Sequence, residues 1–315
     1  TANPLFAQTP NVSLEWVRHF NVNDSLSSAG FDIDAHGCIF VSGVVHNTIT
    51  NASEIVTLRY SADGDLKWAM SFPNPGADLD NARPKIKATG SCGVIVGFNF
   101  ISTMGEMDIT LVKYDSTGAQ QWANTYNGPS NGQDWFTSIA LDNQGNVYAC
   151  GSGSTNANNR FLVIKYNSNG AQQWASLHNS NDFFQSYETA TAITADNTGS
   201  VYTTGYAYNA NGNKDFTTIK YDAGGNEVWV ATFNGQYDLN DNATALAVDG
   251  SGNIIVTGSS NTNSNYGNGL YQFLTVKYDN NGNKQWSKYY GYGMNENQSA
   301  IAAAIGTDND GNIFV

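Results

Sequence analysis

Short segments of alternating apolar and polar residues, each bounded by a turn rich in Asn, Asp and Gly, follow one another along most of the chain. The pattern is clearest over residues 135–177, where it predicts four strands, here called A to D. We expect strand A at 135–141, B at 147–151, C at 161–166 and D at 172–177. The A–B and C–D turns both end in Gly, which suits a tight hairpin. Because no window sustains the 3.6-residue period of a helix, we expect essentially no long helix.

This four-stranded unit recurs with a period of about 54 residues. Its most regular marker is a Trp in strand D, found as Trp16, Trp68, Trp122, Trp174, Trp229 and Trp286. In the last five copies a Gly stands four residues before the Trp, and a Tyr preceded by a base stands four residues before that Gly. Six Trp residues at one structural position predict a packing layer between repeats rather than six binding sites.

Repeats of four antiparallel strands are typical of the blades of a β-propeller. We therefore expect an all-β fold, with one propeller domain over residues 13–315. A strand D at 14–20 opens the domain, five complete A–D repeats follow, and a strand A at 299–305 and the start of a strand B at 313–315 end it. We expect the chain to be truncated at its C-terminus and the complete propeller to have six or seven blades. Residues 1–12 look like the remnant of a secretory signal peptide, with an apolar stub and small residues.

Two motifs recur together: D-x-x-G-N-[VI]-[YF]-x-x-G, as at Gly145-Asn146-Val147, and K-Y-[DN]-x-x-G-x-x-x-W, as at Lys165-Tyr166. Together they resemble the bacterial seven-bladed β-propeller repeat (SBBP-type) family of exported proteins, and the resemblance runs from about Trp16 to Val315. It implies a propeller and a secreted or bacterial cell-surface location. It implies no single activity and supplies no catalytic residues.

The composition narrows the range of partners. The chain has 14 Lys and Arg against 27 Asp and Glu, a net charge of −13 and a pI near 4.4. Such a surface repels phosphate backbones and anionic lipids, so we expect no nucleic-acid partner. No apolar run approaches the ~20 residues of a membrane-spanning helix, so we expect no membrane insertion.

The three cysteines, Cys38, Cys92 and Cys150, are few and widely spaced. An odd number without a C-x-x-C pair fits neither a disulfide framework nor a zinc site. We therefore expect three small apolar side chains on strands.

The B–C and D–A loops should share one face of the propeller, and they are longer and more varied than the A–B and C–D turns. Variable loops on a rigid scaffold are where binding usually occurs. Aromatic residues interleaved with Asn, Asp and Gln in these loops resemble a surface for stacking sugar rings, and they also suit packing or a protein partner. We take as candidate ligand-binding residues Trp135, Phe183, Tyr187, Tyr237 and Tyr292.

A carboxylate recurs near the start of strand A in most repeats. Because strand A should be innermost, these groups predict an acidic ring at the mouth of the channel that could bind Ca²⁺. The alternative is that each carboxylate caps backbone amides in its own loop. The residues concerned are Asp24, Asp80, Asp134, Glu188 and Asp241.

No nucleophile, metal or nucleotide motif has the structural context that its chemistry requires. We therefore expect no cofactor other than the possible Ca²⁺, and a non-enzymatic, secreted or surface-bound propeller that binds glycans or proteins through its B–C and D–A loops. One alternative is a propeller enzyme that acts on glycans as a hydrolase or lyase, since a pair of carboxylates can serve that chemistry. Another is a structural spacer without a ligand.

Overall fold

A computed structural model of the chain describes residues 17, 25–47, 52–73, 83–102, 105–155, 158–178, 187–261, 271–290, 300–308 and 310–315. All regular structure in these residues is β-strand, arranged in five four-stranded antiparallel sheets and one two-stranded sheet. The same residues include no helix of the length and hydrophobicity that crossing a membrane requires.

Each four-stranded sheet is one blade, with its strands paired in sequence order. The first blade contains β1 (Ser25–Ile33), β2 (Ile39–Asn47), β3 (Ala52–Tyr60) and β4 (Leu66–Pro73). The second contains β5 (Lys85–Ala88), β6 (Val94–Ile101), β7 (Met107–Tyr114) and β8 (Gln120–Tyr126). The third contains β9 (Trp135–Leu141), β10 (Val147–Ser154), β11 (Asn159–Tyr166) and β12 (Gln172–Leu177). The fourth contains β13 (Thr189–Ala195), β14 (Val201–Tyr208), β15 (Lys214–Tyr221) and β16 (Glu227–Phe233).

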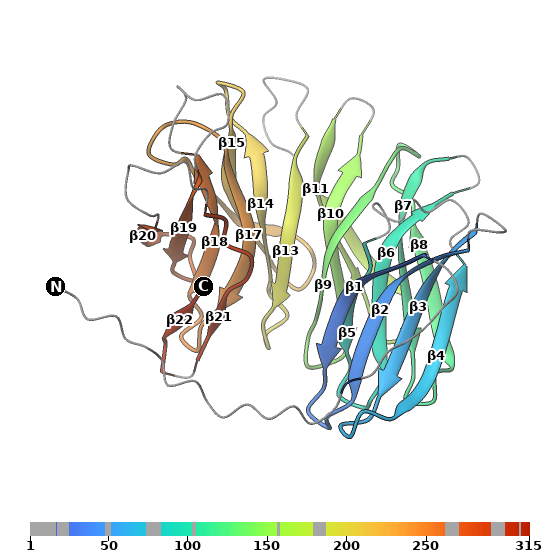
Figure 1. Ribbon diagram of the computed structural model, residues 1–315. Helices are drawn as coiled ribbons and strands as arrows, with labels where there is room; N and C mark the ends of the chain where they lie inside the picture. Colours follow the sequence, from blue (N-terminus) through green and yellow to red (C-terminus); the bar gives the residue numbers. More distant parts are fainter. Residues whose placement is uncertain are drawn as a thin grey trace.

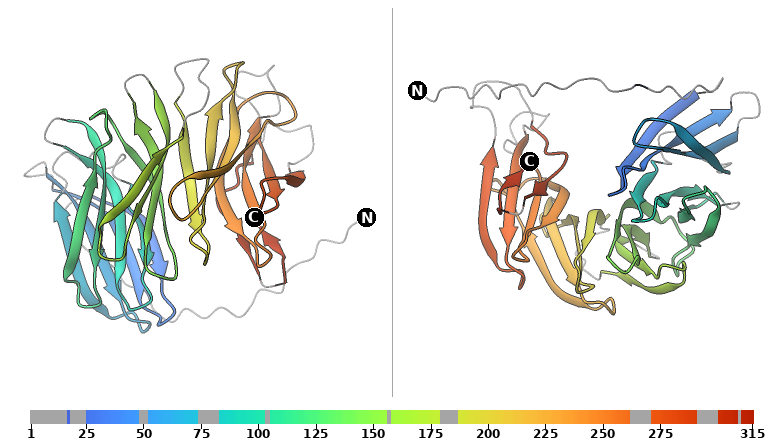
Figure 2. Two further views of the ribbon diagram at one scale, coloured as in Figure 1. Left: turned by 180° about the vertical axis from the view of Figure 1, so that it is seen from behind. Right: turned by 90° about the horizontal axis from the view of Figure 1, so that it is seen from below.

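The fifth blade contains β17 (Asp241–Val248), β18 (Ile254–Asn261), β19 (Tyr271–Tyr278) and β20 (Lys284–Tyr290). The two-stranded sheet, β21 (Gly306–Thr307) and β22 (Ile313–Phe314), follows it. The five blades lie side by side (Figure 1), and seen from below they form an arc with the first and fifth blades at its two ends (Figure 2). The A strands β1, β5, β9, β13 and β17 neighbour one another in that order along the arc. The predicted all-β propeller architecture is confirmed.

The repeated Trp joins each blade to the next, as expected for a packing residue. In the first four blades its indole N–H donates to a backbone carbonyl in the C–D turn of the following blade, at 3.0–3.2 Å. The base that precedes the repeated Tyr donates to the same carbonyl, as Lys113 and Trp122 do to Ser168 at 2.9 and 3.2 Å. The Trp also packs on the buried Tyr of the following blade, with 6.2 Å between the ring centroids of Trp174 and Tyr221. The base and the Trp of one blade therefore form a single interblade contact with the C–D turn and the Tyr of the next blade.

The Gly of the C–D turn belongs to this contact as well. Gly225 has a φ of +85°, a conformation that residues with a Cβ rarely adopt. A Cβ built there would lie 2.6 Å from the ring of Trp174 in the preceding blade. Gly is therefore required at this point both for the backbone turn and for the close approach of the indole.

The loops divide between two faces as the sequence predicts. Asn213 of a B–C loop donates to the backbone carbonyl of Asp238 in a D–A loop, so these two loop types share one face. Tyr202 donates to Asp196 of an A–B turn and to Asn280 of a C–D turn, so the two turn types share the other.

Three expectations need correction or fall outside the described residues. Cys38 and Cys92 form a disulfide that links the first two blades, so the prediction of three unpaired cysteines is wrong. Only Cys150 is a free, buried cysteine. Residues 300–305 are not a strand, and the last sheet uses β21 instead; in this segment the backbone N–H of Ala300 donates to Tyr271, and the carbonyl of Ala302 accepts from Thr244. The expected leader at 1–12 and the strand at 14–20 lie outside the described residues, apart from Val17.

Candidate functional site

A cavity of about 260 Å³ opens where the innermost strands β1, β5 and β9 meet. Its lining includes Phe31, Lys85, Lys87, Ser138 and Ile139. Three blades contribute to it, so the arrangement of the blades creates it rather than any one sheet. We call it the axial pocket.

Both lysines of β5 line this pocket, together with Ile86 between them. Successive side chains on a strand point to opposite faces. Ile86, which is 6% exposed, packs in the apolar core with the first blade, and Lys85 and Lys87 on either side of it are exposed. On β1, Phe31 is exposed to 67% and Ile33 to 51%. An exposed large apolar ring beside two ammonium groups is unusual for a packing surface and is suited to contact with a ligand.

The charges in the pocket are only partly balanced. Nζ of Lys87 lies 3.6 Å from Oδ2 of Asp32, and the same oxygen accepts a hydrogen bond from the backbone N–H of Ala88 at 2.8 Å. Lys85 has no acidic partner among the residues that the structure describes. Arg83, also exposed, precedes β5 and has a φ of +35°, a rare conformation for a residue with a side chain.

Sequence reasoning missed this site. The signal available was the segment Arg83-Pro84-Lys85-Ile86-Lys87, which concentrates three of the chain's 14 bases in five positions. It does not match the repeat motifs, which is why a search for repeated features passed over it.

The predicted carboxylates that the structure describes lie inside the loops. Asp134, Glu188 and Asp241 are at most 1% exposed. Asp134 accepts hydrogen bonds from the backbone N–H groups of Gly128 and Ser154, and Asp241 accepts one from Gly235 in its D–A loop. These contacts are those of the capping alternative. Asp24 and Asp80 lie outside the described residues, and Ca²⁺ binding by the acidic ring stays a prediction.

At two of the boundaries between blades, a second carboxylate lies next to a residue of the predicted acidic ring. Burial, then the charges of Asp134 and Glu106, raise the pKa of Asp108 to about 6. Burial raises the pKa of Asp215 to about 6 as well, with Asp241 and Asp238 adding to the rise against a hydrogen bond from Asn209. Both residues stand six positions before the repeated Tyr, and sequence reasoning did not single them out.

No contact among the described residues gathers the candidate aromatic residues in one place. Tyr187 and Tyr237 are exposed, to 61% and 47%, and Trp135 is half-buried. Next to Tyr237, the carboxylate of Asp238 accepts hydrogen bonds from the side chains of Asn211 and Asn234. Phe183 and Tyr292 lie outside the described residues. Ligand binding by these residues stays a prediction.

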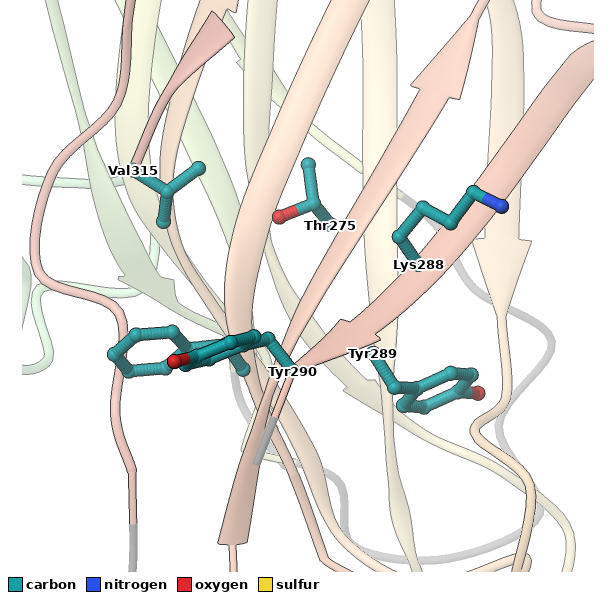
Figure 3. Close-up of a pocket in the computed structure, with 6 residues that line it drawn as sticks. Thr275, Lys288, Tyr289, Tyr290 and Val315 are labelled. Atoms are coloured by element: carbon teal, nitrogen blue, oxygen red, sulfur yellow. The ribbon is translucent and has the colours of Figure 1, made fainter. Parts of the chain in front are cut away.

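A second cavity, of about 310 Å³, lies against the outer strand of the fifth blade. Lys288 and Tyr290 on β20 and Val315 line it (Figure 3), and Tyr290 stacks on Phe273 at 6.1 Å. In the fourth blade the corresponding residues of β16 are Ala231 and Phe233, which belong to the packing between blades. This cavity therefore lies on a blade-stacking face, and we do not take it as the functional site.

One group of potential metal ligands occurs among the described residues: Asp34, His36 and Cys92. Cys92 is oxidised in the disulfide and offers no thiolate. Asp34 is engaged by the backbone N–H groups of His36, Cys38 and Cys92. This arrangement stabilises the turn and does not indicate a metal site.

No family model and no curated protein matches the chain. Solved structures do. The polysaccharide lyase Uly1 matches with a TM-score of 0.54 and 8% identity, over 82% of this chain and 71% of that one. An ulvan lyase matches with a TM-score of 0.52 and 10% identity, over 86% and 73%. An ulvan lyase bound to -[GlcA(1-4)Rha3S]- matches with a TM-score of 0.50 and 10% identity, over 82% and 69%.

At these identities the likeness establishes a shared fold. It nevertheless contradicts the expectation that the protein is not an enzyme, because solved structures that share the fold are polysaccharide lyases.

Proposed function

We propose that the protein is an enzyme that cleaves a polysaccharide and that the axial pocket holds the sugar at the point of cleavage. The observation that carries the proposal is the exposed ring of Phe31 beside the polar groups of Lys85, Lys87 and Ser138, in a concave site formed by three blades. A binding site of this kind combines an apolar surface with a few placed polar groups. The polysaccharide lyases that share the fold support the choice of substrate.

The groups in the axial pocket favour elimination over hydrolysis. Hydrolysis of a glycosidic bond ordinarily uses two carboxyl groups on either side of it. Among the described residues around this pocket we find one, Asp32, which Lys87 and the backbone N–H of Ala88 already engage. In elimination, a base removes the proton α to a carboxylate and that electron pair forms a C=C bond. The C–O bond to the neighbouring sugar breaks, and the departing oxygen takes up a proton.

We further propose that the protein is exported, to the medium or the cell surface. The disulfide between Cys38 and Cys92 supports this location, because disulfides persist in oxidising compartments and are rare in the cytosol. The apolar stub within residues 1–12 points the same way.

The test is a panel of polysaccharides with two measurements on each: the ultraviolet absorbance of the new C=C bond and the number of new reducing ends. A lyase increases both, and a hydrolase increases only the second. We expect both to rise with at least one polysaccharide. A panel in which neither rises would contradict the proposed function.

The position of the site is tested with Phe31→Ser and its matched control Ile33→Ser. Both replace an exposed apolar residue on β1, but only Phe31 lines the axial pocket. We expect Phe31→Ser to lower kcat/KM by about tenfold or more, which is on the order of the stabilisation that an aromatic contact gives. Ile33→Ser should leave it within about twofold. Equal losses in the two variants would move the site away from the axial pocket.

A further inference from the structure

We propose that the axial pocket selects an anionic polysaccharide, whose carboxylate or sulfate groups bind the ammonium groups of Lys85 and Lys87. This inference rests on the proposed function for the kind of ligand, a polysaccharide. It adds the chemical class of the substrate and the side chains that recognise it.

The two lysines lie on one strand and face the same cavity. They are two residues apart, and a strand rises about 3.3 Å per residue, so their Cα atoms are roughly 7 Å apart along β5. Arg83 stands two residues before Lys85 and is also exposed. Lys85 and Lys87 therefore form a pair of cationic groups on the innermost strand of the second blade.

Four of the ten described bases outside residues 83–87 hold neighbouring blades together. Arg59, Lys113, Lys165 and Lys220 donate to backbone carbonyls of the following blade. Lys277, in the fifth blade, binds Asp249 at 2.8 Å. Lys85 makes no such contact with a described residue, and neither the core nor an interblade contact accounts for its position.

The balance of charge in the pocket is the reverse of that in the whole molecule. The chain carries −13, yet the charged groups that the structure describes around the axial pocket are Lys85 and Lys87 against the carboxylate of Asp32. A cationic site in a concave surface concentrates the local field and attracts anions, while the acidic exterior repels extended polyanions such as nucleic acid. A flexible acidic polysaccharide can place one or two sugars in the cationic pocket while the rest of its chain stays away from the acidic exterior.

The recognition chemistry is that of an ammonium group with an oxyanion. Lysine binds carboxylate and sulfate as a compact point charge with three donors, and it does not require the planar geometry that arginine favours. Phe31 then stacks on the sugar ring while the lysines hold its acidic group. Carboxylate and sulfate share this chemistry, so the experiment must separate them.

We would measure binding, rather than cleavage, of four oligosaccharides that share one backbone: sulfated with uronate, desulfated, carboxyl-reduced, and lacking both groups. Calorimetry at low and at high salt gives the affinity and its ionic component. We expect the neutral oligosaccharide to bind at least about tenfold more weakly than the best acidic one, as is typical when a hydrogen bond to a charged group is lost. Whichever single modification causes the loss identifies the acidic group.

The variants are Lys85→Gln, Lys85→Arg and the control Lys288→Gln, which removes the same charge from an exposed lysine of the fifth blade. Lys85→Gln should weaken the acidic oligosaccharide about tenfold, reduce the salt dependence, and leave the neutral one unchanged. Lys85→Arg should restore most of the affinity, because it restores the charge. Lys288→Gln should have almost no effect.

Equal affinity for neutral and acidic oligosaccharides, or equal losses in Lys85→Gln and Lys288→Gln, would overturn this inference. Cleavage of an acidic polysaccharide with the same kcat/KM in Lys85→Gln as in the wild-type protein would overturn it and leave the proposed function intact. Binding of an acidic oligosaccharide through Lys85 without any cleavage would support the inference and contradict the proposed function.

Discussion

The innermost strands of the third to fifth blades differ from those of the first two. In β9, β13 and β17, a Thr stands at the bulge of the strand, and its hydroxyl donates to a backbone carbonyl of the segment that follows in the arc. These bonds run from Thr137, Thr191 and Thr244 to Ala190, Ala243 and Ala302, at 2.6–2.8 Å. In β1 the bulge position is Ala29, and β5 pairs with β6 without a register shift.

The first two blades are joined by other means. Besides the contact of Trp68 with Ser116, a disulfide between Cys38 and Cys92 links them, and the carboxylate of Asp34 accepts the backbone N–H of Cys92 at 2.9 Å. Phe31 on β1 and Lys85 on β5 form no side-chain hydrogen bond or ion pair with another described residue, whereas Lys87 pairs with Asp32 of the first blade at 3.6 Å. Phe31, Lys85 and the other pocket residues occur in this half. The comparison teaches that residues following the repeat hold the propeller together, while departures from the repeat mark the candidate site.

The largest expected effect comes from breaking the disulfide. It closes a loop with a sequence separation of 54 residues. On the chain-entropy model, closing a loop of that size gives about 4 kcal/mol of stability. We expect the double variant Cys38→Ser/Cys92→Ser to lower the free energy of unfolding by about that amount in chemical denaturation. Hydrogen exchange should show the first two blades opening before the other three, because the threonine contacts remain.

The double variant also supplies the control. Adding a reductant to the wild-type protein should reproduce its loss of stability, and adding it to the double variant should change nothing further. If reduction opens all five blades together, the two halves of the arc are not held independently and the comparison fails.

The repeat made the fold predictable from the sequence. The predicted limits of strands A and D in the third repeat agree with β9 and β12, because apolar alternation and Gly turns determine both locally. The disulfide was missed because its two cysteines come from different repeats. Cys38 occupies the position that Asn146 has in the motif, and Cys92 lies where the second repeat departs from the motif, so their proximity depends on how the blades stack.

The candidate site was less predictable, for a physical reason. The sequence located Asp134 and Asp241 at the start of strand A, but whether such a side chain faces a channel or turns into its loop depends on backbone amides supplied by the fold. The axial pocket needs β1, β5 and β9 together, and these strands come from three repeats. No local sequence pattern predicts that these three strands meet, although the cluster of bases at residues 83–87 can be seen in the sequence.

A second comparison concerns the boundaries between blades and predicts an effect of pH. Asp108 and Asp215 stand beside ring carboxylates, whereas the third repeat has Arg160 at the same position. The pKa of each Asp rises from 3.8 to about 6 on folding, so the folded protein binds these protons more tightly than the unfolded chain. Their contribution to stability is fully present below the unfolded pKa and is lost as the pH rises through about 6.

We therefore expect the free energy of unfolding to fall between about pH 5 and pH 7, by on the order of 1 kcal/mol for each residue. Asp108→Asn should remove its share of this slope and make the protein more stable at neutral pH. Asp115→Asn is the matched control, because hydrogen bonds in its exposed turn lower the pKa of Asp115 instead. A slope that survives in the double variant Asp108→Asn/Asp215→Asn would assign the pH dependence to other groups.

The smallest expected effect tests the threonine contacts directly. Thr191→Val keeps the shape of the side chain and removes the hydroxyl that donates to Ala243 at 2.8 Å and to Thr204 at 3.1 Å. Loss of such a bond should cost about 1 kcal/mol in the free energy of unfolding, measured by chemical denaturation. The control is Thr194→Val, at a half-buried position on the same strand where the side chain forms no hydrogen bond with a described residue, and it should be close to neutral. Because β13 lies outside the axial pocket, the affinity for the acidic oligosaccharide should stay unchanged in Thr191→Val. A loss of affinity equal to that in Lys85→Gln would mean that joining the blades and binding the ligand are not separate tasks of the two halves.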